Sequence, residues 1–224
     1  MKTKSVLKVS KKENLLLDRI LERSRILFFK YGYSRLSMDE IAEDLAISKA
    51  TLYRYFPDKE SLLRKVIERV EEQTFCHLND VVTAETSSVK EKLSSFLTFL
   101  SRFLSEISRD FLQDLKTRLP EVWAEMESFR RKKIFPLFSE IVAEGLRRKE
   151  IRPDLDPNLF LEIFVSLAQE FMTPDWLIKN DYSPSALLSE IINIIFYGLF
   201  INDDKDKKKR ENKKKGKRGE NASI

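Results

Sequence analysis

The side chains best suited to chemistry lie in one short segment, residues 35–60 (RLSMDEIAEDLAISKATLYRYFPDKE). Successive side chains on a helix point about 100° apart, so Leu52, Tyr55 and Phe56 would share one apolar face. The opposite face would carry a small residue, a phenol and two cationic side chains: Ala50, Tyr53, Lys49 and Arg54. Such a helix can pack on a core with one face and offer hydrogen-bond donors to a polyanion with the other.

Two short helices would position these side chains, over about residues 38–45 and 49–56. Only Ala46 and Ile47 separate the first helix from Ser48, which can cap the second. This is the arrangement of a helix-turn-helix, whose second helix places its N-terminal half in the major groove of DNA. The segment is therefore interpreted as a DNA-reading surface, although an ordinary solvated helix pair has the same general pattern.

Each exposed side chain suits a particular part of a DNA duplex. Ala50 lets the helix approach the groove closely, and its methyl group can touch a thymine methyl. Arg54 can read guanine, and Thr51 can bond a base edge or a phosphate. The other polar groups suit phosphates, most of all near helix N-termini, where exposed amides favour anions. The predicted DNA-binding residues are Ser37, Ser48, Lys49, Ala50, Thr51, Tyr53, Arg54 and Lys59.

The rest of the composition offers no second kind of chemistry. The 224 residues include one cysteine, Cys76, and one histidine, His77, too few for an intrachain disulfide or a Cys/His zinc site. The sequence contains no phosphate-binding glycine loop and no G-x-S-x-G nucleophile turn. We therefore expect a protein that is not an enzyme and that binds no metal or cofactor.

The pattern of hydropathy predicts a soluble, cytoplasmic protein. The longest apolar stretch, residues 191–201, is too short to cross a bilayer as a helix. The Lys-rich start of the chain does not resemble a signal peptide. We expect no contact with a membrane.

The net charge of +5 is concentrated at the two ends of the chain. Residues 1–12 carry five lysines and no acid, and residues 202–224 carry ten basic and five acidic side chains. These segments are predicted to be a basic extension and a disordered Lys-rich tail, flanking a helix-turn-helix domain (13–60) and a larger C-terminal domain (61–201). Either end could add salt-dependent affinity for DNA or simply be solvated, and for the tail we favour the second interpretation.

Many Leu, Phe, Glu and Lys residues and few glycines predict an all-α chain. Capping boxes begin at Ser10, Ser37 and Ser88, and Gly32 can end the first helix in a left-handed conformation. A short turn is expected around Trp176. The predicted helices span about residues 11–31, 38–45, 49–56, 59–80 (a connector between the domains), 88–107, 109–118, 121–149 (kinked near Pro136), 157–172 and 184–201.

About 45 residues resemble the DNA-binding domain of TetR-family transcriptional regulators. The most specific part is the run T-L-Y-x-Y-F-x-x-K-E, residues 51–60. The other matching positions are Ile20, Leu27, Phe28, Gly32, Tyr33, Ser37, Ile41, Ala42, Ile47, Ser48, Leu62 and Leu63.

The chain departs from the family pattern at four positions. Ala46 stands where the family usually has the turn glycine, which accepts a positive φ more readily, so this turn is expected to be strained. Arg54 stands where His is common, so the operator sequence does not follow by analogy. Arg23 and Ser24 replace small alanines of the first helix.

The resemblance implies that residues after about 82 form a ligand-binding and dimerisation domain, in which the last two helices pair across a two-fold axis. The sequence agrees, because the helix over 184–201 is apolar on nearly every face and must be buried. A symmetric dimer also suits a two-part operator. Ordinary monomer core is the alternative. The predicted interface residues are Phe160, Phe164, Leu167, Phe171, Ile191, Ile195 and Leu199.

Aromatic residues are dense enough in this region to line a cavity for an apolar or aromatic small molecule. The predicted lining consists of Phe103, Trp123, Met126 and Phe164, although each is also explained as core. The basic run over residues 130–133 is interpreted as a solvated helix face.

These patterns together predict a homodimeric, sequence-specific DNA-binding regulator of transcription. In this family such a protein is most often a repressor, released from an operator of approximate two-fold symmetry by a small-molecule effector. A constitutive DNA binder that has lost effector control is one alternative. An enzyme that uses the helical cavity is the other, and the absence of a paired acid and base argues against it.

Overall fold

The computed structural model describes residues 11–154, 156–171 and 173–199, so the basic start and the Lys-rich tail lie outside it. All regular elements in these ranges are helical, which confirms the predicted all-α class. The helices are α1 (Lys11–Tyr31), α2 (Met38–Asp44), α3 (Lys49–Tyr55), α4 (Lys59–Thr83), α5 (Val89–Ser105), α6 (Arg109–Arg118), α7 (Pro120–Phe129), the π-helical segment η1 (Arg130–Ile134), α8 (Phe135–Arg147), α9 (Pro157–Phe171), α10 (Pro174–Lys179) and α11 (Pro184–Leu199).

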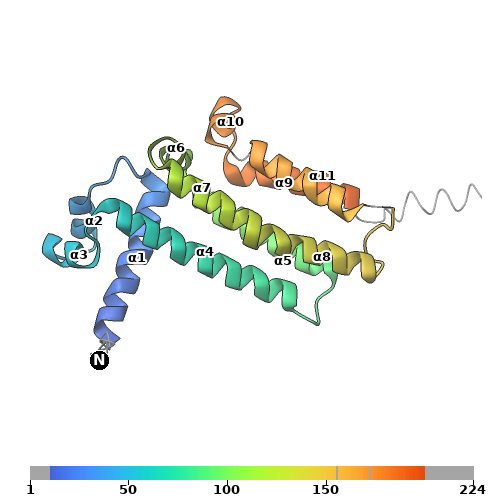
Figure 1. Ribbon diagram of the computed structural model, residues 1–224, viewed down its shortest axis with the longest axis horizontal. Helices are drawn as coiled ribbons and strands as arrows, with labels where there is room; N and C mark the ends of the chain where they lie inside the picture. The colour runs from blue at the N-terminus through green and yellow to red at the C-terminus, as the bar shows by residue number, and fades with distance from the viewer. Residues whose placement is uncertain (1–10, 155, 172, 200–224) are drawn as a thin grey trace, which may run out of the picture.

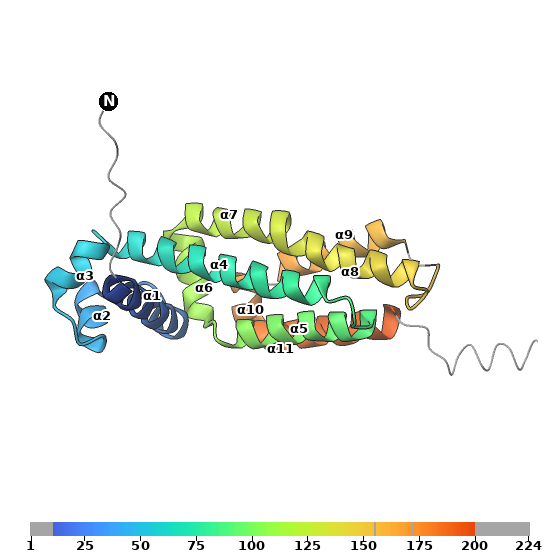
Figure 2. The ribbon, with the colours of Figure 1, turned by 90° about the horizontal axis from the view of Figure 1, so that it is seen from below.

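The helices form a small group at one end of the molecule and an elongated bundle behind it (Figure 1). Helices α1, α2 and α3 make the small group, and α4 runs from it into the bundle, packing on α1 first and on α5 and α8 further along. Seen from below, α4 crosses in front of the bundle, and α9 and α11 lie on its far side (Figure 2). Helix α9 packs on α8, and α11 packs on α5.

The small group folds because its helix starts are capped and its apolar positions coincide. Ser37 begins α2 with the predicted capping box, and Ser48 begins α3 by accepting the Thr51 N–H at 3.1 Å. Ile41 and Leu52 are fully buried between the two helices. Burial of each such side chain contributes roughly 1.5–3 kcal/mol, so α2 and α3 are held together despite their shortness.

The turn between α2 and α3 has the strained backbone that the sequence predicts. Ala46 adopts a φ of +52°, its N–H bonds the Glu43 carbonyl at 2.9 Å, and the Ile47 N–H bonds the Ala42 carbonyl at 3.0 Å. An L-residue with a side chain pays a steric cost in this left-handed region that glycine avoids.

Replacing Ala46 by Gly is therefore expected to raise the free energy of unfolding by about 1 kcal/mol and the melting temperature by about 2–4 °C. Thermal unfolding followed by circular dichroism measures both quantities. The matched control is Ala124→Gly, an exposed position inside α7, which should lower stability by about 1 kcal/mol. Equal destabilisation by the two changes would show that the turn is unstrained.

The predicted helix over 121–149 is one of the places where the structure differs. The helix is interrupted just before Pro136 by the wider η1, where the Phe135 N–H bonds the Arg130 carbonyl five residues back. Pro136 then sits in the first turn of α8, where the amide hydrogen it lacks is not needed. The expected turn around Trp176 is the helix α10, and the connector helix continues to Thr83.

A buried ion pair joins the ends of three helices of the bundle. Lys92 on α5 is only 4% exposed. Its ammonium donates to a Glu144 carboxylate oxygen on α8 and to the Val82 carbonyl near the end of α4, each at 2.8 Å. Glu144 also pairs with Arg148 at 2.6 Å. The hydrogen bond from Lys92 holds the pKa of Glu144 below its usual value.

The described helices include none that is long and apolar enough to span a membrane. The longest of them, α4, is 25 residues long and carries charged residues along its length.

Candidate nucleic-acid interface and internal cavity

The reading head, defined here as α2, the turn and α3 (residues 38–55), presents one face of α3 outward. Lys49, Ala50, Tyr53 and Arg54 are all exposed, and the phenol-bearing side chain of Tyr53 is 47% exposed. Leu52 on the opposite face is fully buried. The structure therefore brings the four side chains predicted for DNA contact onto one accessible surface, with Thr51 half-buried at its edge.

Several of these polar groups already have partners within the protein. The Lys49 ammonium bonds Asp39 on α2 at 2.5 Å, which raises the pKa of Lys49. The Arg54 guanidinium lies 5.3 Å from the ring centre of Tyr55. The Ser48 and Thr51 hydroxyls lie 2.8 Å apart. These contacts hold the side chains in place on α3, but a phosphate would have to share Lys49 with Asp39.

The side chains of Lys59 and Ser37 both make hydrogen bonds within the protein. The Lys59 ammonium donates to the carbonyls of Tyr33 (2.9 Å) and Leu36 (2.6 Å) and lies 4.1 Å from the ring centre of Tyr33. Burial lowers the pKa of Lys59. The Ser37 hydroxyl is committed to Glu40 in the capping box. Lys59 thus ties the turn between α1 and α2 to α4, and phosphate contact by these two residues stays a prediction.

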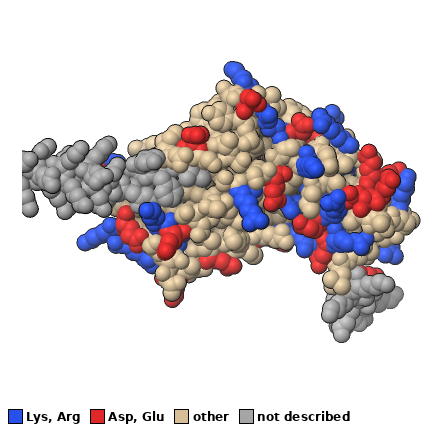
Figure 3. All heavy atoms as spheres, turned by 180° about the vertical axis from the view of Figure 1, so that it is seen from behind, with Lys and Arg blue, Asp and Glu red and all other residues tan. Residues whose placement is uncertain are grey.

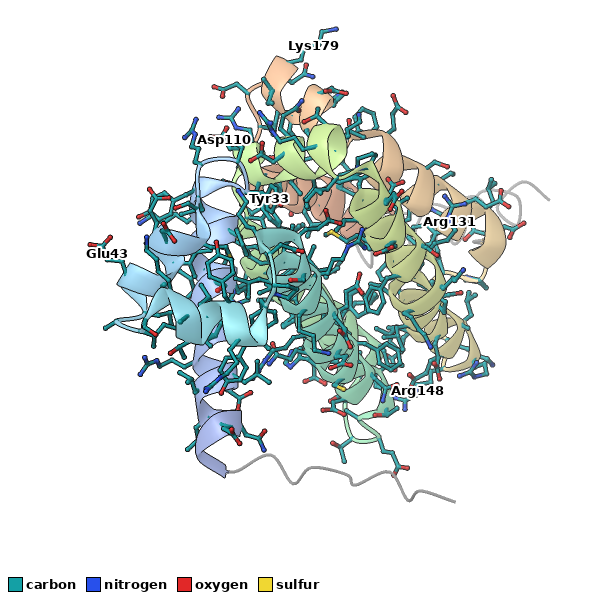
Figure 4. All side chains as sticks on the ribbon, turned by 60° about the vertical axis from the view of Figure 1, so that its left-hand side comes forward. Tyr33, Glu43, Asp110, Arg131, Arg148 and Lys179 are labelled. Carbon is teal, nitrogen blue, oxygen red and sulfur yellow. The ribbon has the colours of Figure 1, made fainter. Side chains whose placement is uncertain are left out.

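The same turn is attached to α6 in the bundle. The Ser34 N–H donates to a carboxylate oxygen of Asp114 at 2.7 Å, and Asp114 is only 8% exposed. Gly32 takes the predicted left-handed conformation at φ +88°, and a Cβ there would lie 2.9 Å from the same carboxylate. Figure 4 shows Tyr33 and Asp110 together at this junction, with Glu43 pointing away from the bundle. The reading head is therefore coupled to α6 through the Asp114 carboxylate.

Charges are mixed over the end of the molecule that carries the reading head. In Figure 3, basic and acidic side chains intermingle there, whereas the middle of the same face carries few charged groups. This agrees with the small net negative charge of residues 13–60. Contact with DNA would thus depend on the placement of a few basic groups rather than on an overall positive field.

An internal cavity of about 170 Å³ opens between helices of the bundle. Of the four residues predicted to line it, Phe103, Met126 and Phe164 do so. Trp123 does not line the cavity. The centre of its indole ring lies 5.6 Å from the guanidinium of Arg130, which does. Most of the remaining wall is aliphatic or aromatic, from α4, α5, α6 and α8.

One part of the cavity wall carries charged side chains that the sequence did not reveal. Glu71 on α4, Glu127 on α7 and Arg130 on η1 line it together. Within the basic run, Arg131, Lys132 and Lys133 are exposed, as predicted, whereas Arg130 is only half-buried and reaches the cavity wall, and burial lowers its pKa. The widened backbone of η1 changes which residues of this run face inward, and no sequence signal marks such a segment.

The far side of the bundle exposes a set of large apolar side chains. On α9, Leu159 and Ile163 are 56% and 51% exposed, and on α11 Ile194 is 71% exposed. Two of the predicted interface residues, Phe164 (5% exposed) and Ile191 (7%), are buried within the protomer, where the Phe164 ring stacks on Phe138 with the ring centres 4.4 Å apart. Phe160 and Phe164 pack on Phe138 of α8, whereas Leu159 and Ile163 are left at the surface.

Burial within the protomer does not decide whether the other predicted residues belong to a dimer interface. Phe160, Leu167 and Phe171 are half-buried, and Phe171 packs edge-on against Trp176 at 5.0 Å. The side chains of Ile195 and Leu199 lie outside the described part of the structure. No group of three or more His, Cys, Asp or Glu able to hold a metal ion is present among the residues described.

A capped helix pair that exposes one polar face of its second helix is the architecture of a helix-turn-helix DNA-binding protein. Residues 20–66 match the family described as "Bacterial regulatory proteins, tetR family". This segment is a TetR-family DNA-binding domain, and the chain is a transcriptional regulator, as the resemblance predicted. Its relatives and its fold are those of DNA-binding regulators rather than of enzymes.

The chain is similar to two curated bacterial regulators. An uncharacterized HTH-type transcriptional regulator, YvaF of Bacillus subtilis (strain 168), is 24% identical over 84% of this chain and 97% of its own. The biofilm operon icaADBC HTH-type negative transcriptional regulator IcaR of Staphylococcus aureus (strain Newman) is 26% identical over 43% of this chain and half of its own. Among solved structures, a TetR transcription regulator from Haloarcula marismortui has the same fold, with a TM-score of 0.65 and 14% identity over 83% of this chain and 99% of that one.

Proposed function

We propose that this regulator is a repressor that binds, as a homodimer, an operator of approximate two-fold symmetry and leaves it when a small molecule enters the cavity. The outward polar face of α3 on a capped and buried helix pair is the observation that carries the proposal. Repression is supported by the similarity of 96 residues of the chain to IcaR, which is described as a negative regulator. The cavity of about 170 Å³ supports control by an effector.

On this proposal, DNA contact divides into base reading and backbone positioning. Arg54 reads a base edge, with Ala50 against the groove floor and Thr51 at the edge of the contact. Lys49 and Tyr53 hold phosphates, together with Ser37, Ser48 and the remaining N–H of Lys59. The basic start of the chain could add to the backbone contacts. We also propose that residues 13–60 and 61–201 act as the DNA-binding and effector domains of a cytoplasmic protein.

Replacing Arg54 by Ala is expected to weaken operator binding by about 1–3 kcal/mol and to relax the preference at one base pair of each half-site. Tyr53→Ala should weaken all sequences about equally. The operator is first obtained by selecting bound sequences from a random DNA library, and both variants are then measured by gel shift on single-base variants of it. Arg147→Ala, an exposed change at the end of α8, is the control. Identical effects of the two reading-head changes would contradict this division of roles.

The coupling between cavity and DNA is proposed to run through α6. Leu112 on α6 lines the cavity, and Asp114, two residues further on, holds the Ser34 N–H of the turn before α2. A ligand that binds one position of α6 better than another would therefore shift the reading head. A regulator without effector control is the alternative, and it would bind the operator equally well with and without a cavity ligand.

A further inference from the structure

We infer that the cavity takes a small organic cation, with its charge near the Glu71 carboxylate and its apolar body among the phenylalanine rings. This inference rests on the proposed function, since it names the class of effector that would act there. It depends on three observations: the size of the cavity, the balance of charge in its wall, and the aromatic rings that line it.

The volume of the cavity limits the size of the ligand. An empty cavity of about 150 Å³ in a protein interior can accommodate benzene. At about 170 Å³, this cavity has room for one aromatic ring or a branched group of similar size together with a compact head group. Long acyl chains and fused ring systems would need the wall to move.

The charged groups in the wall leave a carboxylate in excess. Glu71 and Glu127 contribute two carboxylates, and Arg130 contributes the only guanidinium among the described lining residues. Arg130 is placed between Glu127, at 3.7 Å, and the indole of Trp123. Glu71 has no direct hydrogen bond or ion pair within the described ranges, so it is the group that a ligand could satisfy.

The surroundings of Glu71 disfavour its negative charge. Burial, together with the nearby carboxylates of Glu125 and Glu68, raises the pKa of Glu71 to about 7, and Arg130 only partly opposes this. A bound cation would compensate this charge. A bound anion would instead meet Glu71 and Glu127, with only the already engaged Arg130 in its favour.

The apolar walls suit a cation as well as a hydrocarbon. Phe103, Phe129, Phe135 and Phe164 line the cavity, and the faces of aromatic rings attract cationic groups that have lost their water. A quaternary or tertiary ammonium carries its charge on an apolar surface, so its transfer into such a site costs less than that of a primary ammonium.

The test compares three probes of nearly the same size on the purified full-length protein without DNA. Benzyltrimethylammonium carries the cation, neopentylbenzene has a carbon in place of the nitrogen, and 3-phenylpropionate carries an anion. Calorimetry and tryptophan fluorescence at pH 8 are expected to show the cation binding at least about tenfold more tightly than either of the others. Equal affinities, tighter binding of the anion, or no binding of any probe would each overturn the inference.

Two variants locate the charge that is responsible. Glu71→Gln should reduce the affinity for the cation about tenfold and leave that for neopentylbenzene unchanged. Glu72→Gln, at the exposed neighbouring position on α4, should change neither. An unchanged cation affinity in Glu71→Gln would contradict the role of Glu71. Thermal unfolding checks the fold of this variant, which should be more stable than the natural protein at pH 8, because it removes a disfavoured charge. The difference in stability should shrink as the pH falls through 7 and disappear below 4.5.

Binding should also depend on pH in the direction that Glu71 sets. Between pH 8 and pH 6 the affinity for the cation should fall about tenfold as Glu71 becomes protonated, while that of the carbon analogue stays constant. The other charged groups around it are Glu68, Glu125, Glu127 and Arg130. A pH-independent affinity for the cation would contradict the assignment of this group. Operator binding is measured separately, so a chain that binds DNA but no probe would refute only the ligand class.

Discussion

Replacing Ile163 by Glu is expected to convert the proposed dimer into monomers and to lower operator affinity about 100-fold or more. Ile163 and Leu159 are both exposed on α9, and Ile194 is exposed on α11. A two-fold interface contains each substituted residue twice, so two unpaired carboxylates would be desolvated together. Binding of both half-sites by one linked molecule is worth about 10²–10⁴ in affinity, and a monomer loses it.

Analytical ultracentrifugation at micromolar concentration measures the first effect, and titration of a full operator against a half-site measures the second. Ile178→Glu is the matched control, because Ile178 on α10 is also about half exposed (49%). It should leave the mass and the operator affinity unchanged. If Ile163→Glu sediments as a dimer, the interface lies elsewhere on the molecule.

The second large effect is expected at the buried ion pair. Replacing Lys92 by Ala should lower the free energy of unfolding by about 3 kcal/mol, because Glu144 keeps its charge in a nearly buried position and the Val82 carbonyl loses its donor. The double change Lys92→Met with Glu144→Leu should recover most of this loss, since it removes both charges and keeps the volume. Urea unfolding at pH 7 measures both values.

The dependence on pH has a definite sign. The folded-state pKa of Glu144 is depressed below its usual value of 4.5, so the ion pair stabilises the fold fully above that value. The contribution is lost as the pH falls through the lower folded-state pKa. The difference between the natural protein and Lys92→Ala should therefore be larger at pH 7 than at pH 3. A difference that is independent of pH would show that Lys92 acts through packing alone.

The reading head was predictable from the sequence because its determinants are local. Ser37 and Ser48 cap the helices that follow them by accepting backbone N–H groups only three residues further along the chain. Leu52 and Tyr53 reach opposite faces by the geometry of the helix alone. The positive φ of Ala46 was expected because the family usually has glycine at this position. No contact across the molecule is needed for any of these features.

The cavity and the exposed face of α9 were not predictable in the same way. Ile163 and Phe164 are neighbours of similar hydrophobicity, and only the packing of α9 on α8 determines which is buried. The inward position of Arg130 depends on the π-helical turn before Pro136, which relieves a local backbone conflict. Glu71 is distinguished from other glutamates of α4 only by the helices that cover it.

The arrangement on α6 bears on how such a regulator can evolve. Leu112 and Asp114 face different parts of the molecule, one lining the cavity and the other holding the turn before α2. No residue of α3 lines the cavity, so among the described residues the DNA-facing and ligand-facing sets do not overlap. Substitutions that change the effector need not alter the operator, and the reverse holds as well. Gene duplication followed by change in either set can thus produce a new regulatory pairing while the connection through Asp114 is retained.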